Sequence, residues 1–263
     1  MMDDFLEFFA GGPEIFSRAA FSPPDIAGLQ LWLKAYEITG LSDGDPVTTW
    51  EDSHTSNNDF TQATAAKKPT YQTNEINGLA VVRFDGTDDI LTAANFLSAT
   101  AGTVFAVVRL TSAITYDKYI IGSADEAGAG SSYWGLSPAD AAGFPFSKIQ
   151  TRISGGTANV IDGSTTISAA AVYLMMWRST DTAYTLRVDG NEETVTARSG
   201  ADNGVWLGDV PGRDNFTLGA LKWNAEYGYL KGDLGELVMY DTALSAGNIS
   251  SVETYLNGRW AAF

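Results

Sequence analysis

Three aspartates follow one strand-like segment closely enough for their carboxylates to act together. Residues 76–91 read INGLAVVRFDGTDDIL, which places Asp85, Asp88 and Asp89 directly after an apolar run that contains Arg83. Hard cations bind several carboxylate and carbonyl oxygens, so this spacing is compatible with a Ca²⁺ site. Aspartates also accept hydrogen bonds from backbone N–H groups, and Gly86 suits a positive φ, so a structural turn is the preferred interpretation.

A second set of residues has the chemistry needed to bind sugars. Aromatic rings stack on the apolar faces of pyranose rings, while short polar side chains hydrogen-bond their hydroxyls. A sandwich must also bury large aromatic residues, so each tryptophan has a core interpretation as well. The segment 223–229, polar and interrupted by glycine, is the most promising. The candidate ligand-binding residues are Trp223, Asn224, Tyr227, Tyr229, Tyr133, Trp134 and Trp206.

Composition and charge exclude several kinds of partner and cofactor. The 263 residues include 32 acidic and 16 basic ones, and the formal net charge of −16 repels the phosphates of nucleic acids. The chain has no cysteine, no P-loop, no dinucleotide fingerprint and no zinc-site spacing, so we expect no cofactor other than Ca²⁺. No apolar run approaches the roughly 18–20 residues that span a bilayer, so we expect no membrane insertion.

The elements that must position these residues are mostly strands. Apolar and polar residues alternate in 29–34 and 184–188, whereas 104–108 is apolar on both faces. Further short apolar runs are separated by loops rich in Gly, Asp and Ser. Many short strands and few helices predict an all-β fold, a two-sheet antiparallel sandwich.

One helix is expected near the C-terminal end of the sequence. Ser245 is a good N-cap, and apolar residues recur at helical spacing after it. Gly258 is placed to end the helix. We expect the apolar side of this helix, which carries Ile249, Val252 and Leu256, to pack against the edge of the sandwich.

The first 27 residues are expected to form an N-terminal arm, separate from one domain over residues 28–263. Glycines 11 and 12 with Pro13 would stop a short aromatic helix, and Ser22-Pro23-Pro24 would form a stiff joint. The arm either folds back on its own domain, docks on a partner protein or docks on a symmetry mate. Docking on a symmetry mate would make the chain a homo-oligomer. The candidate docking residues are Phe5, Leu6, Phe8, Phe9, Ile15, Phe16 and Phe21.

Several segments, taken in order, resemble the laminin G-like branch of the concanavalin A-like lectin/glucanase superfamily. They are LQLWLKA, VTTWEDSHTSNNDFTQATAAKKPTY, INGLAVVRFDGTDDIL, GTVFAVVRL, LRVDGNE and GDLGELVMYDTALSAGNISSVETYLNGRW, spread over residues 28–263. The resemblance implies a jelly-roll sandwich in which residues 81–91 form a core strand followed by a turn. The fold hosts lectins, adhesins, hydrolases, lyases and structural modules, so it does not fix the function.

A catalytic role would require carboxylates that this sequence does not arrange. Glucanases of the superfamily carry an E-x-D-x-x-E pattern on one strand, and retaining glycosidases hold two carboxyl groups about 5–5.5 Å apart. The nearest match is Asp233 with Glu236, followed by Asp241, and the resemblance implies a structural role for Glu236. The single histidine, His54, has only adjacent Ser and Asp residues, which cannot converge as a triad. We therefore expect no enzyme.

The expected function is a non-enzymatic structural or adhesive component of a bacteriophage virion, because domains of this resemblance are frequent there. Such a component would be a capsid decoration, a head fibre or a tail adhesin. Its arm would attach to other virion proteins or symmetry mates, and its loops would bind host-surface glycans. Two alternatives stay open: a carbohydrate-binding module of a bacterial surface protein, at the cell surface or outside the cell, and a polysaccharide hydrolase or lyase of the same fold.

Overall fold

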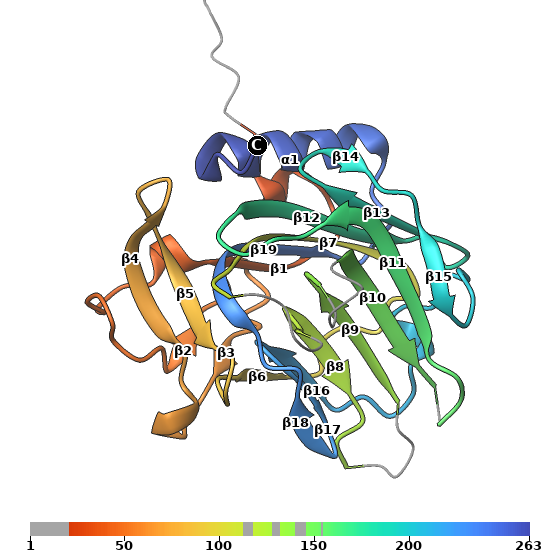
Figure 1. Cartoon of the computed structure of the whole chain (residues 1–263), viewed down its shortest axis with the longest axis horizontal. Helices are drawn as coiled ribbons and strands as arrows, with labels where there is room; N and C mark the ends of the chain where they lie inside the picture. The colour runs from red at the N-terminus through yellow and green to blue at the C-terminus, as the bar shows by residue number, and fades with distance from the viewer. Residues whose placement is uncertain (1–20, 113–117, 128–131, 140–145, 154) are drawn as a thin grey trace, which may run out of the picture.

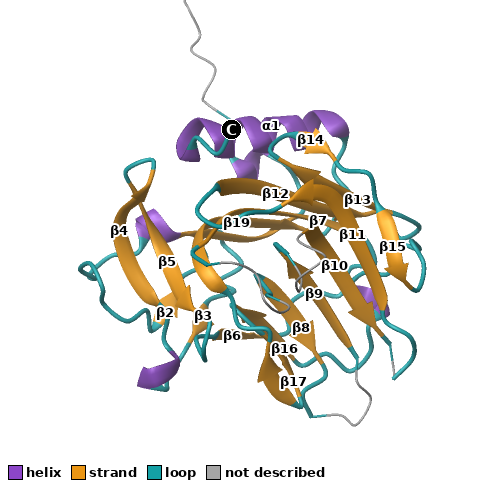
Figure 2. Cartoon of the chain, in the orientation of Figure 1, coloured by secondary structure: helices purple, strands orange, loops and turns teal. Residues whose placement is uncertain are grey.

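Two antiparallel β-sheets face each other across a hydrophobic core, and one long helix lies against one of them (Figure 1 and Figure 2). This computed structural model describes residues 21–112, 118–127, 132–139, 146–153 and 155–263. The predicted all-β sandwich with a C-terminal helix is confirmed. Within the described residues, no helix is both long and apolar enough to cross a membrane.

The first sheet contains eight strands among the described residues. Seven of them lie in the order β14-β13-β12-β7-β19-β5-β4, and β1 pairs with the second half of β19, beyond the part that pairs with β5. The bounds are β1 Leu29–Lys34, β4 Thr70–Ile76, β5 Leu79–Asp85, β7 Gly102–Leu110, β12 Val172–Ser179, β13 Tyr184–Val188, β14 Asn191–Glu192 and β19 Lys231–Tyr240.

The second sheet contains nine strands over the described ranges, in the order β15-β11-β10-β9-β8-β16-β6-β3-β2. Their bounds are β2 Thr49–Trp50, β3 Phe60–Thr61, β6 Leu91–Ala94, β8 Ile121–Ala124, β9 Tyr133–Ser137, β10 Phe146–Arg152, β11 Asn159–Thr166, β15 Thr196–Ser199 and β16 Asn215–Leu218. A separate hairpin and the helices complete the structure: β17 Leu221–Trp223, β18 Ala225–Tyr227, η1 Pro23–Asp25, η2 Ala35–Glu37, η3 Ala65–Lys67, η4 Leu207–Asp209 and α1 Ala246–Trp260.

Strand β7 is buried on both faces, as its apolar sequence predicts. Val104, Ala106 and Val108 belong to the core between the two sheets. Phe105 and Val107 point the other way and join a second apolar cluster, which also contains residues of α1. Because successive strand residues face opposite sides, a strand can be apolar throughout only if something covers both faces. Helix α1 provides that cover for the eight-stranded sheet.

Helix α1 begins at the predicted cap but ends two residues later than expected. The hydroxyl of Ser245 accepts a hydrogen bond from a backbone N–H of the first turn at 3.3 Å. The helix continues through Gly258 to the fully buried Trp260, and Ala261 ends it in the left-handed conformation with φ 49°. It lies across the outer face of the eight-stranded sheet rather than at the sandwich edge (Figure 1). Its apolar face consists of Ile249, Val252, Leu256 and Trp260.

Glu236 of β19 lies fully buried on the sheet face that α1 covers. Its two carboxylate oxygens each accept one indole N–H, from Trp32 of β1 and from Trp260 of α1, both at 2.7 Å. Burial raises the pKa of Glu236, although these two hydrogen bonds act in the opposite direction. The carboxylate therefore connects the sheet to the last turn of the helix, which confirms a structural role.

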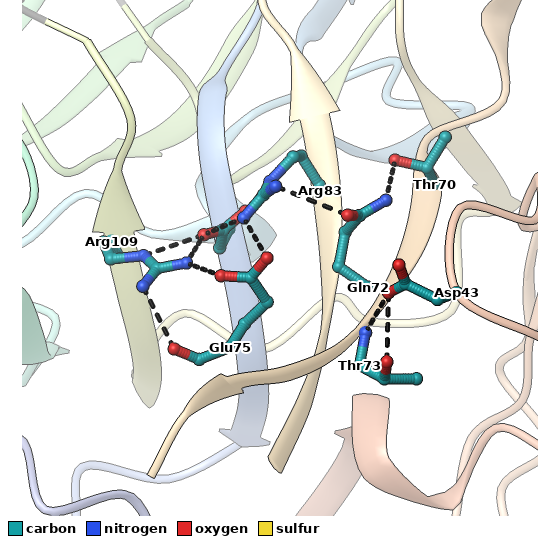
Figure 3. Close-up of polar contacts among 8 residues, drawn as sticks. Asp43, Thr70, Gln72, Thr73, Glu75, Arg83 and Arg109 are labelled. Carbon is teal, nitrogen blue, oxygen red and sulfur yellow. Dashed lines mark hydrogen bonds and ion pairs between the residues drawn. The ribbon is translucent and has the colours of Figure 1, made fainter. Parts of the chain in front are cut away.

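Arg83, the charged residue within an apolar run, belongs to a four-residue ion network on the same outer face. Its guanidinium donates to the fully buried Asp233 of β19 at 2.6 and 3.1 Å. Arg109 of β7 donates to the same carboxylate at 2.8 Å and to Glu75 at 2.6 Å. Figure 3 shows Glu75 of β4, Arg83 of β5 and Arg109 of β7 converging on one point, and β19, which carries Asp233, lies between β5 and β7. A buried carboxylate thus has two cationic partners, and four strands are cross-linked.

The acidic segment after β5 is a hydrogen-bonded turn, which confirms the preferred structural interpretation. Asp85 accepts from the backbone N–H of Thr87 at 2.7 Å, and Asp89 accepts from the N–H of Asp85 at 2.8 Å. Gly86 has φ +80°, and a Cβ there would lie 2.6 Å from the Cβ of Lys231. Burial, and then the neighbouring charges of Asp85 and Asp88, raise the pKa of Asp89 to about 6.

Replacement of Glu236 by alanine should destabilise the protein severely. The change leaves two buried indole N–H groups without an acceptor and opens a cavity beneath α1. We expect the free energy of unfolding in urea to fall by about 3–5 kcal/mol. Glu51→Ala, at an exposed position, is the control and should stay within about 0.5 kcal/mol of wild type. Equal unfolding midpoints for Glu236→Ala and wild type would contradict this role.

Asp89 should make the protein less stable as the pH rises from about 4 to 7. An unfolded aspartate has a pKa of about 3.9, whereas the folded-state pKa of Asp89 is about 6. In that window the folded state holds the extra proton, so stability is lost as pH increases, by about 2–3 kcal/mol. Asp89→Asn should remove this slope and be more stable than wild type at pH 7. Asp181→Asn, at an exposed site, is the control, and parallel profiles for wild type and Asp89→Asn would refute the assignment.

Candidate functional site

The outer face of the nine-stranded sheet carries polar and aromatic side chains instead of a helix. In β9 and β10, Trp134 and Ile149 point into the core between the sheets. The alternate residues Tyr133, Gln150 and Arg152 therefore point outward. Arg152 lies directly opposite Tyr133 in the β9–β10 register, so the two side chains are neighbours on this face.

The β17–β18 hairpin adds two more rings to this face. Trp223 lies 5.4 Å from Tyr133 between ring centroids, and Tyr227 lies 5.8 Å from Tyr119. Trp223 and Tyr227 are themselves 6.0 Å apart. We call these four residues, Tyr119, Tyr133, Trp223 and Tyr227, the aromatic platform. Tyr119 and Tyr133 are buried, whereas Trp223 and Tyr227 are half-buried and keep part of their surface exposed.

Local sequence explains why these rings can gather here. Tyr119 lies against Gly135 of β9, where a Cβ would be 2.6 Å from the tyrosine ring, so only glycine lets the ring lie this close to the strand. The hairpin turns at Asn224, which has φ 56°, a left-handed conformation that asparagine adopts more readily than most residues. Asn224 is exposed at the tip of the hairpin.

Hydrogen bonds fix the orientation of the two tyrosines of the platform. Gln150 donates to the hydroxyl of Tyr133 at 2.6 Å and accepts from the hydroxyl of Tyr119 at 3.0 Å. One amide therefore orders both phenols before any ligand arrives. Sites that are ordered in advance lose less conformational entropy on binding.

Arg152 supplies a positive charge beside the platform. Its guanidinium lies 5.5 Å from the ring centroid of Trp223, within the range of a cation–π contact. It donates to the backbone carbonyls of Gly156 and Gly155 at 3.0 and 3.3 Å. Across the described parts of the chain no carboxylate pairs with it, which is notable in a protein of net charge −16. The guanidinium therefore keeps donors for polar groups of a ligand.

The structure separates the predicted ligand-binding residues into three groups. Trp223, Asn224, Tyr227 and Tyr133 lie together at the platform. Tyr229 is half-buried and instead donates a hydrogen bond to Glu226 at 3.0 Å. Glu226 in turn forms an ion pair with Lys67, which links the hairpin to η3.

Trp134 and Trp206 are corrections to the predicted set. Both are fully buried in the core between the sheets, with ring centroids 5.0 Å apart. The prediction named both as candidate ligand-binding residues, but Trp134 lies within β9 and points to the inner face. Neither ring can contact a ligand at the surface.

Three contributors were missed by reasoning from the sequence: Tyr119, Gln150 and Arg152. A signal for the last two was present, because Lys148, Gln150 and Arg152 alternate with Ser147, Ile149 and Thr151 at the period of a strand. This alternation identifies one polar face. It does not say that an aromatic hairpin some 70 residues later in the chain would lie on that face.

The three turn aspartates remain a candidate cation site. One carboxylate oxygen from each of Asp85, Asp88 and Asp89 can be chosen so that all three lie within 4.8 Å of one another. Two of the three carboxylates already accept backbone N–H groups of the turn. Ca²⁺ binding here therefore stays a prediction.

None of the three carboxylates considered for glycoside hydrolysis is arranged for it. Glu236 is covered by α1, and Asp233 is buried between two arginines. Asp241 accepts a hydrogen bond from Gln30 at 2.9 Å. Each carboxylate therefore has a structural partner.

A pocket of about 430 Å³ beside η2 is the main alternative to the platform as a ligand site. Its buried Lys34 is paired with Glu37 at 2.5 Å, and its Asp52 accepts three backbone N–H groups. No aromatic ring lines this pocket within the described residues. The charged groups of Lys34, Glu37 and Asp52 are satisfied by the protein itself, so we prefer the platform.

Of the predicted docking residues, only Phe21 falls within the described part of the chain. It is half-buried and packs edge-on against Tyr255 of α1, with ring centroids 6.3 Å apart. Phe21 thus folds back on its own domain. The other six, Phe5, Leu6, Phe8, Phe9, Ile15 and Phe16, lie outside the described residues.

Comparison by sequence finds no matching family model and no curated protein similar enough to count as a relative. Comparison of structures finds sandwich domains. The CBM40 of the Ruminococcus gnavus IT-sialidase, bound to alpha2,3 sialyllactose, matches with a TM-score of 0.52 and 15% identity over 66% of this chain and 95% of that one. Domain 4 of AbnA, a GH43 extracellular arabinanase from Geobacillus stearothermophilus, in complex with arabinotriose, matches with a TM-score of 0.55 and 15% identity over 86% and 98%.

A Trypanosoma rangeli sialidase in complex with sialic acid also matches, with a TM-score of 0.53 and 17% identity, but the match covers 88% of this chain and only 33% of that one. At such identities the likeness shows the fold alone. The structural neighbours of this chain include carbohydrate-binding modules and sialidase domains, which agrees with the jelly-roll sandwich. Membership of the laminin G-like branch stays a prediction from the sequence.

Proposed function

We propose that this protein is a non-catalytic carbohydrate-binding sandwich domain whose ligand lies on the aromatic platform. The observation that carries the proposal is the partly exposed pair Trp223 and Tyr227, with Arg152 beside Trp223, on the sheet face that α1 does not cover. An aromatic surface with a few fixed polar groups around it is the usual composition of a small-ligand site.

The chemistry of the platform matches that of a sugar. The C–H groups on one face of a pyranose or furanose ring pack on an indole, and the hydroxyls at the ring edge need hydrogen-bond partners. Arg152 offers donors, while exposed Asn224 at the hairpin tip offers a donor and an acceptor. Because Gln150 already orders the tyrosines, little rearrangement is needed on binding.

The structural neighbours support this class of ligand without fixing its identity. One is in complex with sialyllactose and another with arabinotriose, so similar sandwiches accept both an acidic and a neutral glycan. This supports the alternative expected from the sequence, a carbohydrate-binding module, more than a hydrolase or lyase. Attachment through the arm stays a prediction, because residues 1–20 lie outside the described part. The place in a bacteriophage virion and the oligomeric state also stay predictions.

Binding to a glycan array, followed by calorimetry with sialyllactose and arabinotriose, tests the proposal. Trp223→Ala should weaken binding of any glycan found by at least about tenfold, which corresponds to ~1.4 kcal/mol, because the stacking surface is lost. Its thermal unfolding should change little, since Trp223 is half-buried at the end of a hairpin.

Phe263→Ala is the matched control for this variant. Phe263 is an aromatic residue with 56% of its surface exposed, near the C-terminal end of α1 and away from the platform. Its loss should leave glycan affinity unchanged. Equal affinity of wild type and Trp223→Ala, or no binding to any glycan by the wild-type chain, would overturn the proposed function.

A further inference from the structure

Arg152 belongs to two neighbouring surfaces. Its guanidinium lies 5.5 Å from the ring centroid of Trp223, at the edge of the aromatic platform. The same residue also lines a pocket of about 280 Å³ beyond the end of β10, together with Ile153, Asn159 and Asn203. The platform and this end pocket are therefore adjacent, with one arginine between them.

The end pocket has both kinds of surface that a sugar unit needs. Ile153 is 40% exposed, one of the two large apolar side chains that the described residues leave exposed. The side-chain amide of Asn159 already has protein partners, because it donates to the Oδ1 of Asn203 at 2.9 Å and accepts from the backbone N–H of Ala201 at 3.1 Å. This orientation leaves the Nδ2 donors of the exposed Asn203 without a protein partner in the described part of the chain.

The size of the end pocket suits one unit of a chain rather than a whole ligand. Pockets for complete small ligands measure about 300–1,000 Å³, so 280 Å³ lies just below that range. The arginine between the two surfaces has its Nε and Nη2 groups committed to the carbonyls of Gly156 and Gly155. Its Nη1 group remains for a ligand hydroxyl at the junction.

We infer that the platform and the end pocket are two subsites of one binding surface, so that the preferred ligand is an oligosaccharide of at least two sugar units. The first unit stacks on Trp223, Arg152 contacts the linkage region, and the next unit occupies the end pocket beside Asn203 and Ile153. This inference rests on the proposed function, since it needs the platform to bind the first unit.

The experiment compares ligands of increasing length on the full chain. The probes are arabinose, arabinobiose and arabinotriose, and sialic acid beside sialyllactose, measured by calorimetry. For wild type we expect the longer member of at least one series to bind about tenfold more tightly than its monosaccharide. Asn203→Ala should remove most of this gain, leaving the affinity for the monosaccharide unchanged.

Two further variants keep the result interpretable. Asn203→Asp retains the Oδ1 acceptor used by Asn159 but removes the Nδ2 donors, so it should lose the same gain even if Asn203→Ala disturbs the loop. Asn248→Ala, in the first turn of α1, is the matched asparagine control and should bind like wild type.

The outcomes separate this inference from the proposed function. Equal affinity for short and long probes, or an equal loss for both in Asn203→Ala and Asn203→Asp, overturns the two-subsite inference while glycan binding stands. Absence of binding by wild type to every probe and to the glycan array overturns both. The inference is supported if affinity increases with the number of sugar units in wild type and in Asn248→Ala, but not in the two Asn203 variants.

Discussion

The buried carboxylate of Glu236 determines which face of the sandwich is free. It accepts the indole N–H groups of Trp32 and Trp260 at 2.7 Å each, and so holds the end of α1 on the eight-stranded sheet. With the helix there, the outer face of that sheet becomes a second core. Burial of a charge costs free energy unless the group is well hydrogen-bonded. A helix position that did not bring Trp260 to Glu236 would lose one of these hydrogen bonds, so the position of α1 is specified. The same geometry removes Glu236 from contact with any substrate.

The open face of the other sheet acquires its character from strand alternation and from one hairpin. In β10 every second residue is free of the core, and the chain places Gln150 and Arg152 there. The β17–β18 hairpin then places Trp223 beside Arg152 and Tyr133, and Tyr227 beside Tyr119. Neither part would make a site alone, because the strand lacks an exposed ring and the hairpin does not itself supply the guanidinium of Arg152. The proposed site therefore depends on segments about 70 residues apart in the chain.

Local patterns predicted the fold better than the site. The sandwich, the doubly buried strand β7 and the N-cap of α1 follow from periodicity over a few residues, as does the turn at Gly86. Arg83 could not be explained in this way, since its partner Asp233 is 150 residues distant. The same limit applies to Trp134, which was a candidate ligand-binding residue by its type and neighbours, although strand pairing directs its ring inward. The end of α1 depends on the burial of Trp260, which is also a tertiary effect.

Hydrogen exchange of the backbone amides, with and without the glycan that binds most tightly on the array, tests the central claim most directly. If the platform is the ligand face, exchange should slow in β9, β10 and the β17–β18 hairpin, while α1 and the pocket beside η2 stay unchanged. Slower exchange confined to the η2 pocket or to the Asp85–Asp89 turn, with no change at the platform, would place the ligand elsewhere and contradict the account.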